Sequence, residues 1–177
     1  DHGTSRGLGD VYKRQQRYLY YTVKEGLRKN LPVELSLIPF VESQFDPYAR
    51  SATGASGIWQ FIPSTAKENG LKKNWWYDGR RDIVASTEAA YGFLSNLYEK
   101  YGDWLIAIAA YNAGPSRIRK EIEKNKKKGL PTDFWSLNLP RETKSYVPKI
   151  LAIVELIRDP DKFNICLLYT SDAADDL

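Results

Sequence analysis

One stretch of the chain is apolar around the whole circumference of a helix, and it constrains the fold more than any other feature. Residues 104–110 read Trp-Leu-Ile-Ala-Ile-Ala-Ala, with no charged or amide side chain on any face. A helix that is apolar all round has to be buried, so other elements must pack around it. Asp103 is suited to cap its N-terminus and Gly114 to end it. The pattern predicts a central helix over 104–113.

The rest of the chain also has a helical pattern. Residues 82–101 carry apolar side chains at steps of three and four, which is typical of an amphipathic helix with one buried stripe. Proline, glycine and capping residues delimit the other expected helices, over 16–29, 33–43, 63–70, 115–128 and 141–158. Residues 44–62 form a loop rich in small residues, with room for a short hairpin. Because no alternating pattern is sustained, we expect a mainly α, single domain.

Both ends of the chain resemble translated DNA from a sequencing adapter. Codons that fit 10–15, when reverse-complemented and read in a shifted frame, encode residues like those at 166–171. We therefore expect 1–15 and 166–177 to be adapter and residues 16–165 to be the domain, taken from a longer gene. A signal segment, a membrane anchor or cell-wall-binding domains can then lie elsewhere in that gene.

This division changes which chemistry the domain can use. The only histidine is His2 and the only cysteine is Cys166, and both fall in the expected adapter. A domain without either residue cannot use Ser-His-Asp or Cys-His catalysis, or zinc held by histidine or cysteine. We expect no metal and no cofactor, and a carboxylate is the acid–base group that remains.

The charge of the chain favours an anionic partner. The formal net charge is +4 at pH 7, and the excess of basic residues is larger within 16–165. Such a surface suits nucleic acid, an anionic membrane surface or an acidic cell-wall polymer. Residues 120–128 supply much of the excess, for which a solvated helix face is the simplest interpretation. No nucleic-acid motif is present and no aromatics interleave with the basic run, so we expect no nucleic-acid partner.

Glu42 is the candidate acid–base group. It closes an almost wholly apolar stretch, residues 35–41, and a polar turn follows at once. On a helix over 34–43 it falls between Leu35 and Ile38. A carboxyl among apolar side chains loses hydration, which raises its pKa and keeps it protonated near neutral pH. The position suits a general acid, and a solvated glutamate at a helix end is the alternative.

Two further segments combine small residues, aromatics and side-chain amides. They are 54–61, Gly-Ala-Ser-Gly-Ile-Trp-Gln-Phe, and 109–114, Ala-Ala-Tyr-Asn-Ala-Gly. Together with Glu42 and Ser43, they resemble in order and spacing the three signature motifs of the lytic transglycosylases of the lysozyme-like superfamily. The resemblance covers about 17–160. Later segments that also resemble this family are 77–82, 132–135 and 142–148.

The resemblance implies a lysozyme-like fold of the goose-type or soluble lytic transglycosylase kind, with a glycan cleft. It also implies a single-carboxylate mechanism on the glycan strands of peptidoglycan. Glu42 would protonate the β-1,4 glycosidic oxygen between N-acetylmuramic acid and N-acetylglucosamine, then act as base on the C6 hydroxyl of the muramic acid. Attack by this tethered hydroxyl closes a 1,6-anhydro ring without water. The implied location is the bacterial cell envelope, in the periplasm, with or without a membrane anchor.

Three candidate substrate-binding residues come from the resemblance. Gln60 belongs to the motif that lines the cleft, and Asn112 lies close to the catalytic glutamate. Both carry amides that can donate to and accept from acetamido and hydroxyl groups. Tyr146 is implied to be a hydrogen-bond partner of Glu42. Packing in the core of the last helix is the alternative for Tyr146.

The other candidates for substrate binding depend on their positions in the chain. Tyr111 ends the apolar helix, where its ring can pack while its hydroxyl reaches the cleft. Ser43 either orients Glu42 or ends its helix. Trp59 and Phe61 are candidates to stack on sugar faces, and we expect one of the two to face the core. The tryptophans expected in the core rather than at the ligand are Trp75, Trp76, Trp104 and Trp135.

No second carboxylate clearly fits the role of nucleophile. Asp46 precedes a proline, which is typical of a turn. Asp78 and Asp82 are expected to cap a helix or to pair with Arg80 and Arg81. The missing second carboxylate favours a transglycosylase. Two alternatives remain open: a lysozyme-type muramidase that uses water on the same fold, and a non-catalytic peptidoglycan-binding domain.

Overall fold

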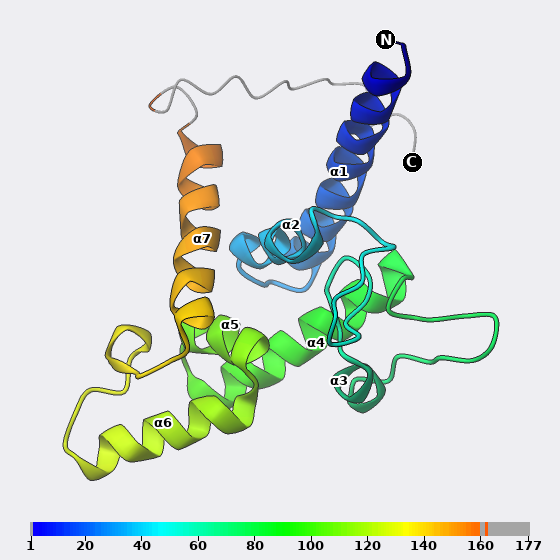
Figure 1. Ribbon diagram of the computed structural model, residues 1–177. Helices are drawn as coiled ribbons and strands as arrows, with labels where there is room; N and C mark the ends of the chain where they lie inside the picture. The colour runs from blue at the N-terminus through cyan, green and yellow to red at the C-terminus, as the bar shows by residue number, and fades with distance from the viewer. Residues whose placement is uncertain (1, 160–161, 163–177) are drawn as a thin grey trace.

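The apolar helix lies at the centre of the molecule. In the computed structural model, which describes residues 2–159 and 162, this helix is α5 (Trp104–Ala113). Around it lie α4 (Ile83–Tyr101), α6 (Pro115–Lys127) and α7 (Arg141–Arg158), each in contact with α5 (Figure 1). The Asp103 carboxylate accepts hydrogen bonds from the first backbone amides of α5, as predicted for a cap.

In the sequence, four of the remaining elements precede α4 and one lies between α6 and α7. They are α1 (His2–Arg28), the 3₁₀ helix η1 (Val33–Leu37), α2 (Ile38–Ser43), α3 (Pro63–Glu68) and the 3₁₀ helix η2 (Phe134–Ser136). The mainly α prediction is confirmed. The described residues contain isolated β-bridges and no β-strand of greater length. In the described part of the chain, no helix is both long and apolar enough to cross a lipid bilayer.

Two expected borders differ from the structure. The helix expected over 33–43 is divided between η1 and α2, because Pro39 has no amide hydrogen to donate and fits only the first turn of a helix. The helix expected from residue 16 extends backward to His2, so the backbone has no break at the expected adapter border. The second expected adapter segment, 166–177, lies outside the described residues.

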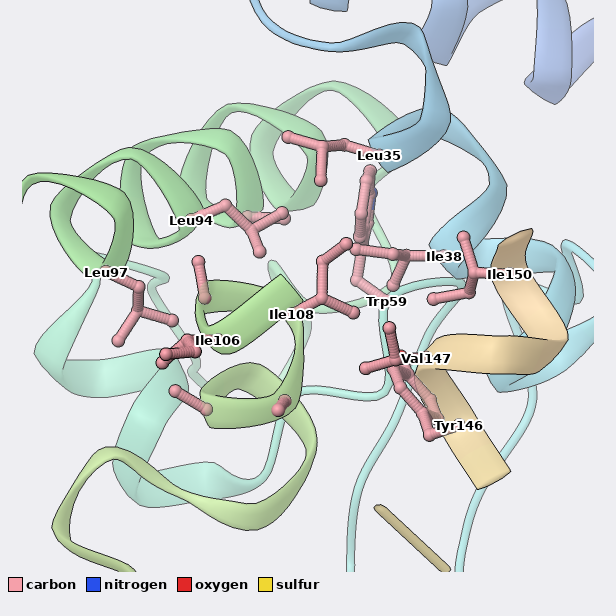
Figure 2. Close-up of a cluster of buried hydrophobic side chains, with 14 of the residues drawn as sticks. Leu35, Ile38, Trp59, Leu94, Leu97, Ile106, Ile108, Tyr146, Val147 and Ile150 are labelled. Carbon is pink, nitrogen blue, oxygen red and sulfur yellow. The ribbon is translucent and has the colours of Figure 1, made fainter. Parts of the chain in front are cut away.

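One hydrophobic core joins the elements that carry the candidate site. Figure 2 shows buried side chains of η1, α2, α4, α5 and α7 meeting around Trp59. Leu35 and Ile38 contribute from the Glu42 side of this core, and Val147 and Ile150 contribute from α7. Because each of these side chains is fully buried, α2 and α7 are held against each other and the groups they carry are kept in register.

The loop before α3 is organised without a regular hairpin. Arg50 pairs with Ser56, and Ser56 pairs with Phe61, each as an isolated bridge. The short hairpin for which 44–62 has room is therefore present only as these two contacts. Residues 55–59 are nevertheless buried, since the loop folds inward over α4 and α5.

Candidate active site

Glu42 lies near the end of α2 and is half-buried. Burial raises the pKa of its carboxyl to about 7, because the charged form loses hydration. The hydroxyl of Tyr146 opposes this rise by donating a hydrogen bond of 2.5 Å to Glu42 Oε1. The negative charge of Glu142 raises the pKa of Glu42 further. The raised pKa predicted from the apolar stretch is confirmed. At neutral pH the carboxyl is divided between its acid and base forms.

Tyr146 reaches Glu42 from the second turn of α7. Its side chain is buried, and burial raises the pKa of its hydroxyl well above 10, with the charge of Glu42 adding to the effect. The hydroxyl therefore keeps its proton and remains a donor to the carboxylate. The hydrogen bond implied by the resemblance is present, and it joins residues separated by 104 positions in sequence.

Asn112 lies on the last turn of α5 and is tied to α7. The Thr143 hydroxyl donates to Asn112 Oδ1 at 2.8 Å, which fixes the orientation of the amide. The amide nitrogen makes no hydrogen bond within the described part of the chain and can donate to a ligand. Sequence reasoning missed Thr143. Its spacing of three residues from Tyr146 on one helix is the signal that indicates a shared face.

Tyr111 holds the loop in front of α5. Its hydroxyl donates to the backbone carbonyl of Trp59 at 2.8 Å, and its ring packs edge-on against Phe61 with centroids 6.1 Å apart. Burial raises the pKa of this hydroxyl well above 10, and the charge of Glu42 contributes. In this structure, therefore, the Tyr111 hydroxyl supports the loop beside the carboxyl.

Ser43 and Gln60 also form hydrogen bonds to the backbone of this loop. The Ser43 hydroxyl donates to the Ile58 carbonyl at 2.9 Å and so joins the end of α2 to the loop. The Gln60 amide nitrogen donates to the carbonyls of Gly57, at 2.8 Å, and Ala49, at 3.3 Å. The Gln60 carbonyl oxygen has no partner among the described residues and remains available as an acceptor.

Trp59 and Phe61 are both buried, so the expectation that only one of them faces the core is wrong. Residues two apart in an extended strand would already face the same side, and the turn at Gln60, with a φ of 50°, also leaves both rings in the core. The Trp59 indole donates to the Thr87 hydroxyl at 3.0 Å and packs edge-on against Tyr91. Phe61 thus lies beneath the site, against the ring of Tyr111.

A buried ion pair holds the loop from behind. The guanidinium of Arg80 donates to both oxygens of Asp78, at 2.9 and 2.7 Å, which confirms the predicted pairing. It also donates to the carbonyls of Gly54 and Phe61, at the two ends of the 54–61 loop. Gly57 approaches so closely that a Cβ there would lie 1.7 Å from the Arg80 carbonyl oxygen. The conformation of the 54–61 loop therefore depends on Arg80 and Asp78, which lie outside the loop.

The other acidic residues near the site have structural roles. Asp46 accepts the amide of Tyr48 in a turn, and Asp82 caps α4 through the amide of Ala85, as predicted. Within residues 2–159 and 162, no group of three or more acidic, histidine or cysteine side chains is placed to hold a metal ion. The lysines of 120–128 are exposed along and just after α6, as expected for a solvated helix face.

The prediction that the four remaining tryptophans lie in the core is wrong for three of them. Trp75 and Trp76 are 88% and 90% exposed, and Trp135 is 64% exposed. Trp104 is half-buried and stacks on Tyr98, with ring centroids 4.2 Å apart. The prediction failed because it relied on average burial, whereas Trp75 and Trp76 occupy a turn that projects from the helices (Figure 1).

Comparison with known proteins agrees with this architecture. The family model described as "Transglycosylase SLT domain" matches residues 20–133. Membrane-bound lytic murein transglycosylase D of Escherichia coli K12 is 47% identical over 94% of this chain, which spans 37% of that protein's length. Membrane-bound lytic murein transglycosylase F of Maricaulis maris is 31% identical over 66% of this chain, which spans 26% of that protein.

Two solved structures share the lysozyme-like fold. An inactive mutant of the lytic transglycosylase Slt from Pseudomonas aeruginosa has a TM-score of 0.60 and 25% identity, over 86% of this chain and 25% of that one. The 70 kDa soluble lytic transglycosylase of Escherichia coli has a TM-score of 0.55 and 26% identity, over 69% and 21% of the two chains. With its family model matched over most of the described residues, the chain belongs to the transglycosylase SLT domain family.

Proposed function

We propose that this domain is a peptidoglycan lytic transglycosylase with Glu42 as its single general acid and base. One observation carries the proposal: the Glu42 carboxyl is desolvated to a pKa of about 7 and receives a hydrogen bond from a buried tyrosine. A group that donates a proton in one step and accepts one in the next works best when its pKa lies near the operating pH. A carboxyl in a binding module has no need of this environment.

The proposed reaction has two proton transfers. Protonated Glu42 gives its proton to the glycosidic oxygen between N-acetylmuramic acid and N-acetylglucosamine as the bond from that oxygen to C1 of the muramic acid breaks. The resulting carboxylate then takes the proton of the C6 hydroxyl, whose oxygen bonds to C1 and closes the 1,6-anhydro ring. The Tyr146 hydrogen bond stabilises the carboxylate between the two transfers.

The amide groups beside Glu42 are suited to position the glycan. The Asn112 nitrogen is free to donate while Thr143 fixes its carbonyl oxygen, so the donor points in one direction. The Gln60 oxygen can accept from an acetamido N–H. We propose that the 54–61 loop and the end of α5 form the walls of the glycan cleft. Ser43, Tyr111 and Phe61 act by holding these walls in place.

We further propose that residues 16–165 are the catalytic domain and that it acts in the cell envelope. The match of the family model to 20–133 lies inside this range and supports the division. Relatives named as membrane-bound murein transglycosylases support peptidoglycan as the substrate and the envelope as the location. A membrane anchor and cell-wall-binding domains belong, in this proposal, to parts of the gene outside the domain.

The decisive experiment is mass spectrometry of the products released from purified peptidoglycan sacculi. The wild type is compared with Glu42→Gln and with a matched control, Glu99→Gln, at an exposed position of α4. We expect muropeptides that end in 1,6-anhydro-N-acetylmuramic acid from the wild type and the control, and none from Glu42→Gln. In the solved relative from Pseudomonas aeruginosa, a glutamate-to-glutamine substitution accompanies the loss of activity stated for that protein.

Three outcomes would contradict the proposal. Reducing-end products, heavier by about 18 mass units because hydrolysis adds one water, would identify a muramidase instead. Equal turnover by Glu42→Gln would remove Glu42 from the mechanism. Binding of sacculi without products from the wild type would indicate a peptidoglycan-binding module.

A further inference from the structure

Two adjacent tryptophans lie on the surface of the domain. Trp75 and Trp76 are 88% and 90% exposed, although tryptophan is the largest amphipathic side chain. Their rings meet edge to face, with centroids 6.4 Å apart and planes at 84°. Figure 1 shows that the segment between α3 and α4 projects from the helical body on the side away from α7. The pair is therefore separate from the candidate active site, to which α7 contributes Tyr146.

The backbone of residues 72–79, which we call the tryptophan turn, holds this pair in place. The Asn74 amide donates to the Tyr77 carbonyl at 2.8 Å, and the Gly79 amide donates to the Lys72 carbonyl at 2.9 Å. The Asn74 side chain closes the turn by accepting two backbone amides, each at 2.8 Å. Both tryptophans thus occupy the tip of a turn with its own hydrogen bonds.

The base of the tryptophan turn is fixed to the domain. Asp78 pairs with buried Arg80, and the Tyr77 hydroxyl donates to Asp82 at 3.1 Å. Since the backbone of the turn is already ordered, little conformational entropy is lost when the tip binds a surface. An ordered apolar tip whose rings are almost fully exposed is suited to contact another surface.

The charge next to the tip is positive. Lys72 and Lys73 precede it, and both are exposed. Lys73 lies 3.9 Å from Asp78, but that carboxylate is already neutralised by Arg80 at 2.7 Å. The turn therefore presents two indole rings flanked by two lysines. Tryptophan together with basic side chains is the combination that favours the interface of an anionic bilayer.

The shape of the tip separates a lipid surface from a glycan. Small ligands and sugars are bound in concave sites, whereas this turn projects from the helical body (Figure 1) and its two rings are nearly perpendicular. Two perpendicular rings cannot both lie flat on one glycan strand. They can both enter the headgroup layer, where the ring body is buried and the indole N–H stays hydrated.

We propose that the tryptophan turn docks the domain on an anionic lipid bilayer. Trp75 and Trp76 enter the interfacial layer, and Lys72 and Lys73 lie against the headgroups. Docking through this turn leaves the Glu42 side of the molecule free, because the turn and α7 lie on different sides of the body (Figure 1).

The test is co-sedimentation of the protein with vesicles of phosphatidylcholine and phosphatidylglycerol in a ratio of about three to one. The variant is Trp75→Ser/Trp76→Ser, and the matched control is Trp135→Ser, which removes an exposed tryptophan elsewhere. We expect the wild type and the control to bind, with tryptophan emission shifted to shorter wavelength in the wild type. The double variant should bind the vesicles at least about tenfold more weakly than the wild type. Its release of products from sacculi should be unchanged.

A Lys72→Gln/Lys73→Gln variant tests the contribution of charge. It should lose most of the preference for phosphatidylglycerol over pure phosphatidylcholine vesicles, and added salt should have the same effect on the wild type. Absence of vesicle binding by the wild type would overturn the proposal, as would equal binding by the tryptophan double variant. If the tryptophan double variant lost binding to sacculi but kept binding to vesicles, the tip would recognise glycan instead.

Discussion

Replacing Glu42 by glutamine should change how the stability of the domain depends on pH. The carboxyl has a pKa of about 7 in the folded protein, against an ordinary value of 4.5. Between these values the folded state holds a proton that the unfolded state has lost. Raising the pH through this window therefore favours unfolding, and the wild type loses stability from about pH 4.5 to about pH 7.

The magnitude follows from the two pKa values. A difference of about 2.5 pH units at about 1.4 kcal/mol each makes the loss about 3 kcal/mol. Glutamine has no proton to lose, so the variant should not share this loss. Any packing cost of the glutamine is the same at every pH and cancels when the two proteins are compared across the range.

The assay is urea unfolding followed by circular dichroism, between pH 4 and pH 8, for the wild type and Glu42→Gln. We expect the difference in the free energy of unfolding, variant minus wild type, to increase by about 3 kcal/mol between pH 4 and pH 8. Other carboxylates titrate in both proteins and do not affect the difference. Glu99→Gln, at an exposed site, should follow the wild type. Parallel curves for Glu42→Gln and the wild type would refute the desolvation of Glu42 and, with it, the argument for a general acid.

Three further substitutions test the support of the site. Tyr146→Phe removes the hydrogen bond that lowers the pKa of Glu42, so the alkaline limb of the pH–rate profile should move up by about one pH unit while turnover falls. Gly57→Ala should lower the free energy of unfolding by about 3 kcal/mol, measured in urea, because φ is +82° and the new Cβ meets the Arg80 carbonyl oxygen. Asp78→Asn leaves the buried Arg80 guanidinium without its ion-pair partner and should cost about 3 kcal/mol in the same assay.

Each of these predictions has a control variant or an outcome that would contradict it. An unchanged alkaline limb in Tyr146→Phe would mean that the tyrosine does not stabilise the carboxylate. Gly54→Ala shares a φ of +82° with Gly57 but meets nothing within 4 Å, so it should cost about 1 kcal/mol, and equal costs at the two glycines would exclude the clash. Asp46→Asn, in an exposed turn, should have little effect on stability, unlike Asp78→Asn.

Much of the fold was predictable because it depends on neighbours in the sequence. The predicted helix over 104–113 matches α5, since an all-apolar run with an aspartate cap leaves few alternatives. The last predicted helix, over 141–158, matches α7, because Pro140 just before it marks where the helix begins. The raised pKa of Glu42 also followed from its apolar neighbours in the chain. Where the local signal was mixed, at Pro39, the prediction missed the division into η1 and α2.

The sequence by itself determined the helical class and the position of the buried helix, and it singled out the carboxyl that we propose for acid–base chemistry. Only the tertiary structure decided which groups surround that carboxyl. Tyr146 meets it across 104 positions, Thr143 fixes the Asn112 amide across 31, and Arg80 supports the loop from behind across 26. These contacts depend on how separate helices pack, and no local periodicity encodes which side chains then face each other. The same packing left the tryptophan turn outside the core, although its two tryptophans were expected to be buried.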